Sequence, residues 1–154
     1  MDSHTDINFF NTQNTNDCVY LLSDEFNDII NVHYKPLARK GMFSLMHINC
    51  RSLLCNYDEI LNFNSSLNNV FDVLCVSETW LTDATEDLIN IEGYTFVGKH
   101  RKNQRGGGVG IYVRNELKFK IRRDIISDSE NCEIIAIEIV NDKEKNIIII
   151  TDAI

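Results

Sequence analysis

Two apolar runs with a periodic segment between them dominate the first half of the chain. Residues 43–50 and 70–76 are each mostly apolar, and polar residues close the first run and follow the second, as is typical of buried strands. Between them, residues 57–67 carry apolar side chains about one helical turn apart, which predicts a helix with one buried face. This order of strand, helix and strand predicts a βαβ-like unit.

The second half of the chain alternates short apolar runs with turn residues. We expect strands at residues 94–99, 109–114, 117–122, 132–140 and 146–150. The segments 134–140 and 147–150 are so rich in Ile and Val that we expect burial on both of their faces. The pattern as a whole predicts an α/β protein with a mixed sheet and helices outside it.

The beginning of the chain has a different character. Residues 1–17 are rich in Asn, Asp and Thr, which predicts a disordered or loosely packed arm. Ser23 is a suitable cap for a short helix near residues 24–31, whose apolar side would dock on the domain. We therefore expect a polar arm over residues 1–41 and a single domain over residues 42–154.

Length and composition limit the class of protein. A chain of 154 residues with 44% hydrophobic and 25% charged residues is typical of one globular domain. Its five cysteines are odd in number and lie mostly in apolar runs, so we expect reduced thiols in a nuclear or cytoplasmic protein. No apolar run has the roughly 20 residues of a membrane span, and the amino terminus lacks the basic start of a signal peptide. We therefore expect no membrane association and no secretion.

Basic residues are unevenly distributed along this acidic chain. The net charge is −8, yet residues 99–123 contain nine of the fifteen Lys and Arg residues and a single acid, Glu116. Such a basic segment could guide a polyanion to one face of the protein, or it could be a solvated hairpin whose lysines protect a sheet edge. On the first interpretation, the phosphate contacts are Arg101, Lys102 and Arg105.

Two polar residues stand where α/β sheets place their functional sites. Asn49 and Glu78 each follow or close an apolar run, at the predicted carboxyl end of a strand. A carboxylate there suits a hard divalent cation, and an amide both donates and accepts hydrogen bonds without adding charge. The alternative is ordinary turn capping for both residues. We expect His47 to be a packing histidine and Trp80 to serve either as a packing anchor or as a base-stacking side chain.

A glycine-rich run precedes one of the predicted strands. Residues 106–110 lack the Lys-Ser/Thr ending of a phosphate-binding P-loop and lead into a strand rather than a helix, so we do not expect a nucleotide site. The glycines more simply permit a tight turn with positive φ. That turn would bring the basic loop before it close to the substrate face.

Four short sequence motifs, in the order in which they occur along the chain, resemble those of a known family. They are residues 46–53 (MHINCRSL), 73–81 (VLCVSETWL), 91–94 (IEGY) and 105–113 (RGGGVGIYV). They look like the endonuclease domain of non-LTR (LINE-type, jockey-like) retrotransposon polyproteins, within the endonuclease/exonuclease/phosphatase superfamily. The resemblance extends over residues 43–150.

The resemblance implies a fold and a chemistry. The fold would be a four-layered α/β sandwich, with two mixed sheets face to face and helices outside, present here incompletely. The activity would be phosphodiester hydrolysis in DNA with Mg²⁺, or with Mn²⁺ in its place. Glu78 matches the family's metal-binding glutamate, and Asn49 matches the asparagine that lies beside the metal. An intact relative would nick target DNA for reverse transcription, so a reverse transcriptase region is expected there.

The motifs that come later in the family's sequence have no counterpart in this chain. A Gly-Asp-Phe-Asn-like word would supply the general base and a phosphate-binding asparagine, and a Ser-Asp-His-like word would end the domain. We therefore expect a truncated amino-terminal part of such an endonuclease that is inactive by itself and exposes a surface meant for the second sheet, favouring association. The alternatives are a non-catalytic remnant that binds nucleic acid through residues 99–123, or a phosphatase of the same superfamily.

Overall fold

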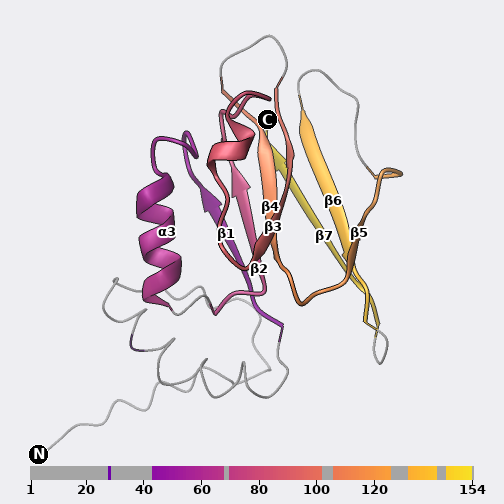
Figure 1. Ribbon diagram of the computed structural model, residues 1–154. Coiled ribbons are helices and arrows are strands. Elements are labelled where there is room, and N and C mark those ends of the chain that lie inside the picture. The colour runs from indigo at the N-terminus through magenta and orange to yellow at the C-terminus, as the bar shows by residue number, and fades with distance from the viewer. Residues whose placement is uncertain are drawn as a thin grey trace, which may run out of the picture.

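Two β-sheets packed face to face form the body of the protein (Figure 1). The computed structural model describes residues 28, 43–67, 70–101, 106–125, 132–141 and 145–153, and the description below concerns these residues. The polar arm expected over residues 1–41, with its helix near residues 24–31, lies outside them except for Asp28. In the described part of the chain, no helix is long and apolar enough to cross a membrane.

The first sheet, sheet A, contains the predicted βαβ-like unit. Its four strands, in spatial order, are β1 (Leu45–Asn49), β2 (Val73–Ser77), β4 (Val109–Arg114) and β3 (Tyr94–Lys99). Strands β1 and β2 are parallel and are connected through helix α3 (Tyr57–Ser66), whereas β4 runs antiparallel to both of its neighbours. The parallel register sets Asn49 opposite Ser77, the residue before Glu78. Sheet A therefore brings the ends of β1 and β2 together.

The second sheet, sheet B, is antiparallel throughout. Its strands, in spatial order, are β5 (Phe119–Ile121), β6 (Glu133–Ile139) and β7 (Ile147–Ala153). Sheet A is mixed, as predicted, whereas the described strands of sheet B are all antiparallel. A short 3₁₀ helix, η2 (Glu86–Leu88), lies in the connection from β2 to β3.

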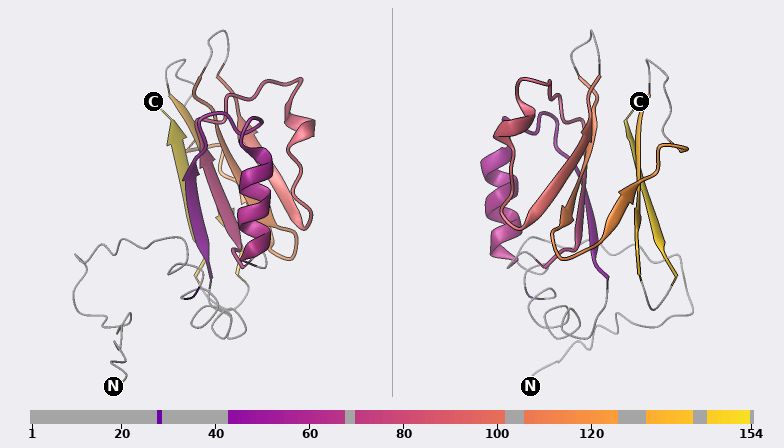
Figure 2. Two further views of the ribbon diagram at one scale, coloured as in Figure 1. Left: turned by 90° about the vertical axis from the view of Figure 1, so that its left-hand side faces the viewer. Right: turned by 45° about the vertical axis from the view of Figure 1, so that its right-hand side comes forward.

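Two hydrophobic cores hold three layers together. Helix α3 covers the face of sheet A that is turned away from sheet B (Figure 2). The outer core between α3, the η2 connection and sheet A includes Ile60, Leu74, Ile89 and Tyr112. The inner core between the two sheets contains ten buried residues: Val73, Cys75, Val109, Ile111, Val113, Ile135, Ile137, Ile139, Ile149 and Ala153. Among the described residues, helix and sheets make three layers of the expected four-layered α/β sandwich.

The two strands at one side of the sandwich are less buried than the sequence suggests. In β1 exposed and half-buried residues alternate, and in β7 exposed and buried residues alternate over most of the strand, whereas β2 is buried at every position. The expected burial of β1 and of both faces of β7 is therefore wrong, and that of β2 is confirmed. The reason is position in the sheet, because each is an edge strand and no strand of sheet B packs against β1. Hydrophobic runs alone do not distinguish an edge strand from a central one.

Apolar side chains are exposed on these edge strands. Leu45 on β1 is 45% exposed, and Ile148 and Ile150 on β7 are 47% and 54% exposed. An exposed strand edge with several isoleucines is a surface on which other chains pair or aggregate. Association through this surface remains a prediction.

Candidate active site

Three loops meet at the end of sheet A where β1 and β2 finish (Figure 1). They are residues 50–53 after β1, residues 78–80 after β2 and residues 106–108 before β4. Ser52 and Leu53 donate backbone N–H groups to the carbonyl oxygens of Glu78 and Thr79, both at 2.8 Å. The second loop is tied to the third in the same way, because Thr79 and Trp80 donate to the carbonyls of Gly108 and Gly107 at 3.2 and 3.0 Å. We call this arrangement the three-loop junction.

The junction holds four non-glycine residues in the left-handed region of the backbone. These are Arg51 (φ 41°), Ser52 (φ 88°), Glu78 (φ 54°) and Trp80 (φ 52°). Such conformations cost on the order of 1–3 kcal/mol each and persist only where surrounding interactions enforce them. Here the hydrogen bonds between the loops provide that enforcement. Clusters of backbone strain are typical of functional sites, and this one adjoins both Asn49 and Glu78.

The carboxylate of Glu78 is anchored through one of its two oxygens. Oε2 accepts the indole N–H of Trp80 at 2.8 Å and the backbone N–H of Gly107 at 3.2 Å. Within the described residues, Oε1 has no hydrogen-bond partner, and the side chain is half-buried. The structure thus presents one oxygen of a well-held carboxylate at the end of the sheet.

Asn49 ends the neighbouring strand at the same edge of the sheet. It is the last residue of β1, is exposed and forms no side-chain hydrogen bond with any described residue. Its register partner Ser77 comes directly before Glu78. The two predicted site residues are therefore brought together at one edge of the sheet, as the strand pattern indicates. His47 lies two residues before Asn49 and is also exposed, so the expectation of a packing histidine is wrong.

A buried ion pair between Arg101 and Glu133 contacts the glycine turn of residues 106–108. Arg101 donates to Glu133 through Nε at 2.8 Å and Nη2 at 2.9 Å, and Gly108 N–H donates to the same carboxylate at 3.2 Å. Only 3% of the Glu133 side chain is exposed. Burial by itself raises the pKa of Glu133, but the hydrogen bonds from Arg101 and Gly108 outweigh it and bring the pKa below its ordinary value.

The close approach of this pair explains why glycines form the turn. Gly107 and Gly108 have φ angles of 66° and 83°. A Cβ atom on Gly107 would lie 2.6 Å from the guanidinium of Arg101, and one on Gly108 would lie 2.5 Å from Oγ1 of Thr79. The prediction of a tight turn with positive φ is confirmed. The sequence interpretation missed Glu133. An acidic residue at the start of an isoleucine-rich strand indicates a buried charge that needs a basic partner.

The thiol of Cys50 is part of the same junction. Its Sγ–H donates to the carbonyl oxygen of Ser77 at 3.0 Å. Burial raises the pKa of the Cys50 thiol to about 11, and the negative charge of Glu78 adds to that rise. The thiol therefore stays protonated and acts as a hydrogen-bond donor. The described cysteines, Cys50, Cys55, Cys75 and Cys132, are all unpaired thiols, and Cys55 is exposed.

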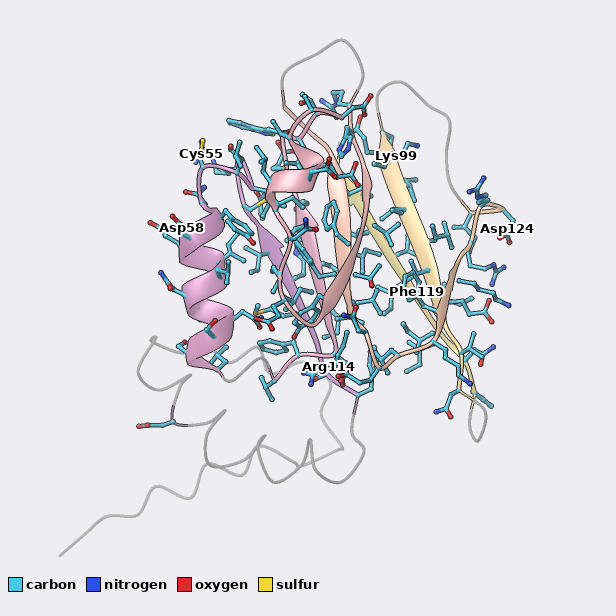
Figure 3. All side chains as sticks on the ribbon, in the orientation of Figure 1. Cys55, Asp58, Lys99, Arg114, Phe119 and Asp124 are labelled. Carbon is cyan, nitrogen blue, oxygen red and sulfur yellow. The ribbon has the colours of Figure 1, made fainter. Side chains whose placement is uncertain are left out.

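The predicted basic contacts are only partly described. Lys102 and Arg105 lie outside the described residues, and Arg101 uses two N–H groups for Glu133. Other described cations of the segment also contact acids, since Arg114 lies 3.5 Å from Asp72 and Lys120 lies 3.2 Å from Glu138. Lys99 and Arg114 stand at opposite ends of sheet A (Figure 3). The described cations of residues 99–123 therefore do not form one stripe.

Comparison with known proteins places this architecture in a family. The protein is an α/β sandwich with a polar site at one end of a sheet. That site contains the hydrogen-bonded carboxylate of Glu78 and the exposed amide of Asn49, at the ends of adjacent parallel strands. Residues 46–150 match the endonuclease/exonuclease/phosphatase family, and the chain belongs to that family. It is therefore related to hydrolases of the nuclease and phosphatase type. No match was found among curated proteins.

A solved structure supports the fold. The chain is similar to the AP endonuclease LMAP from Leishmania major, with a TM-score of 0.50 and 20% sequence identity. The similarity covers 70% of this chain and 38% of that one. The chain thus corresponds to well under half of the length of that endonuclease. At this identity the comparison concerns the fold alone.

The Arg101–Glu133 pair generates a prediction about stability. Glu133→Gln keeps the side-chain shape but removes the charge, so we expect the free energy of unfolding at pH 7 to fall by about 1–3 kcal/mol. The lowered pKa of Glu133 means that its stabilising contribution is present above the ordinary value of 4.5 and is lost as the pH falls through the lowered pKa. Denaturant unfolding from pH 7 to pH 3 should therefore show the difference between wild type and variant shrinking in acid.

The exposed Glu116 provides the matched control for this measurement. Glu116→Gln should change the free energy of unfolding by no more than about 0.5 kcal/mol at any of these pH values. A Glu133→Gln difference that stays constant down to pH 3 would contradict the assigned charge interaction.

Proposed function

We propose that the protein is a magnesium-dependent DNA endonuclease of the non-LTR retrotransposon type, which hydrolyses phosphodiester bonds in target DNA. The observation that carries this proposal is the carboxylate of Glu78, held through Oε2 at the three-loop junction, with Asn49 at the end of the adjacent parallel strand. Membership of the endonuclease/exonuclease/phosphatase family and the fold shared with an AP endonuclease support it. The sequence words of residues 46–53 and 73–81 favour the retrotransposon branch.

The donor chemistry at the junction fits a magnesium ion. Mg²⁺ prefers oxygen ligands, keeps several waters and commonly binds through one or two carboxylates together with substrate phosphate. Glu78 would supply a carboxylate oxygen, and Asn49 would orient waters or phosphate oxygens through its amide. When bound, the ion supplies Lewis-acid polarisation of the phosphate and stabilises the leaving oxygen. Mn²⁺ has the same ligand preference and is the convenient substitute in experiments.

The described residues account for only part of such a site. They contain no group of three or more His, Cys, Asp or Glu side chains arranged around one point. We propose that a general base and a phosphate-binding group, each worth orders of magnitude in rate, come from residues outside the described part or from a further protein segment. Hydrolysis by this chain alone is then slow. A reverse transcriptase region belongs to the proposed intact relative.

The proposed DNA contacts fall between β3 and β4 in the sequence. Arg101, Lys102 and Arg105 come shortly before the glycine turn that holds Glu78, and the proposal is that they bind the phosphates on which the site acts. Arg101 already binds Glu133, which makes its first role structural and leaves its remaining N–H groups for phosphate. A remnant that binds nucleic acid along the whole of residues 99–123 is less consistent with cations that lie at opposite ends of sheet A.

Plasmid nicking tests the catalytic part of the proposal. Purified protein at high concentration should convert supercoiled plasmid to nicked circles in Mg²⁺. Glu78→Gln should slow this by at least about 100-fold, because it removes the carboxylate proposed to hold the ion that stabilises transition-state charge. Glu92→Gln, which removes an exposed carboxylate elsewhere, is the matched control and should nick like the wild type. Equal nicking by wild type and Glu78→Gln would refute the catalytic role.

DNA binding tests the basic loop. In fluorescence anisotropy with a short duplex, the double variant Lys102→Ala/Arg105→Ala should bind more weakly. The slope of log affinity against log salt concentration should fall by about 2, roughly one unit for each lost phosphate contact. Arg123→Ala, an exposed cation after β5, should leave the slope nearly unchanged. Identical slopes for the double variant and the wild type would contradict the assignment.

A further inference from the structure

Trp80 stands in an unusual relation to the carboxylate two residues before it. Glu78 and Trp80 both have positive φ angles, of 54° and 52°, so the chain folds back and the indole N–H reaches Oε2 of Glu78 at 2.8 Å. The backbone N–H of Trp80 is fixed to Gly107 at 3.0 Å, and the side chain is 36% exposed. The left-handed backbone at these two residues thus directs the indole N–H toward the carboxylate.

The two hydrogen bonds to Glu78 converge on one oxygen. Oε2 accepts both the indole N–H of Trp80 and the backbone N–H of Gly107. A carboxylate oxygen offers about two lone-pair directions, so these two donors occupy Oε2. Hydrogen bonds to an ionised group are about twice as strong as neutral ones, which makes rotation of the carboxylate costly. Oε1 is the oxygen left to bind a ligand.

We propose that Trp80 is a positioning residue that fixes the Glu78 carboxylate so that a divalent cation binds through Oε1 alone. This inference rests on the proposed metal site at Glu78 and goes beyond it by assigning the mode of binding and its selectivity. Mg²⁺ and Mn²⁺ favour octahedral sites that one carboxylate oxygen suits, whereas Ca²⁺ readily takes both oxygens of one carboxylate. The indole N–H thereby favours the smaller cations over Ca²⁺.

The test compares variants that separate the indole N–H from the aromatic ring. Trp80→Phe keeps an aromatic ring but lacks the N–H donor. Mn²⁺ binding, measured by electron paramagnetic resonance of the free ion, should weaken by about 10–100-fold, as is common when a partner of a metal ligand is removed. Competition with Ca²⁺ should show a preference shifted toward Ca²⁺, because the released carboxylate can offer both oxygens.

Two controls make the result specific. Glu78→Gln should lose Mn²⁺ binding at the junction altogether. Tyr94→Phe removes a hydroxyl that donates to the carbonyl oxygen of Phe71, away from the junction, and should bind Mn²⁺ and Ca²⁺ like the wild type. If Glu78→Gln binds Mn²⁺ normally, the metal site of the proposed function is wrong. If Glu78→Gln loses binding while Trp80→Phe keeps wild-type affinity and Ca²⁺ preference, the role of Trp80 is overturned and the metal site stands.

A second measurement uses the wild-type chain, in case Trp80→Phe fails to fold. Trp80 is the single tryptophan of the sequence, so a ¹⁵N spectrum contains one indole N–H signal. This signal should be protected from exchange with water and should shift when Mg²⁺ is added, with no shift in Glu78→Gln. A signal that exchanges like free indole and ignores Mg²⁺ in the wild type would overturn the proposal.

Discussion

The hydrogen bonding between three loops at the end of sheet A is the constraint on which the rest of the site depends. Backbone N–H groups of Ser52, Leu53, Thr79 and Trp80 each find a carbonyl on a neighbouring loop. These bonds satisfy polar groups that would otherwise be orphaned near the core. They also hold the left-handed conformation at Glu78 that directs its carboxylate toward the glycine turn. Without the junction, the Glu78 carboxylate would follow a strand with no fixed orientation.

Each sheet contributes to the junction through a different interaction. Sheet A sets the register that brings Asn49 beside Glu78, and sheet B supplies Glu133, which holds Arg101 and Gly108. The packing of the sheets and the geometry of the site are therefore linked through one buried ion pair. Glu133 accepts hydrogen bonds from both Arg101 and Gly108, so the pair fixes the position of the glycine turn. Removing one partner of such a pair is destabilising because it leaves an uncompensated buried charge.

The sequence predicted the elements well because their hydrophobic patterns are local properties. Strands β3 and β4 have the predicted limits, and helix α3 begins at the predicted residue, Tyr57. The convergence of Asn49 and Glu78 followed from the rule that parallel strands finish at the same edge of a sheet. The exposure of β1 and β7 was not predictable from local hydrophobic patterns. It arises because both strands lie at the edge of a sheet, which depends on how distant parts of the chain pair. The partner of Arg101 was missed for the same reason, since residue 133 is distant in the chain.

The most direct test of the account is a crystal structure of the protein soaked in Mn²⁺, with the anomalous signal used to locate the ion. We predict a single site at the three-loop junction, with the ion within about 2.2 Å of Oε1 of Glu78 and with Oε2 still hydrogen-bonded to Trp80 and Gly107. Mn²⁺ bound elsewhere, or bound by both oxygens of Glu78, would contradict the claim that the junction presents one oxygen to a divalent cation.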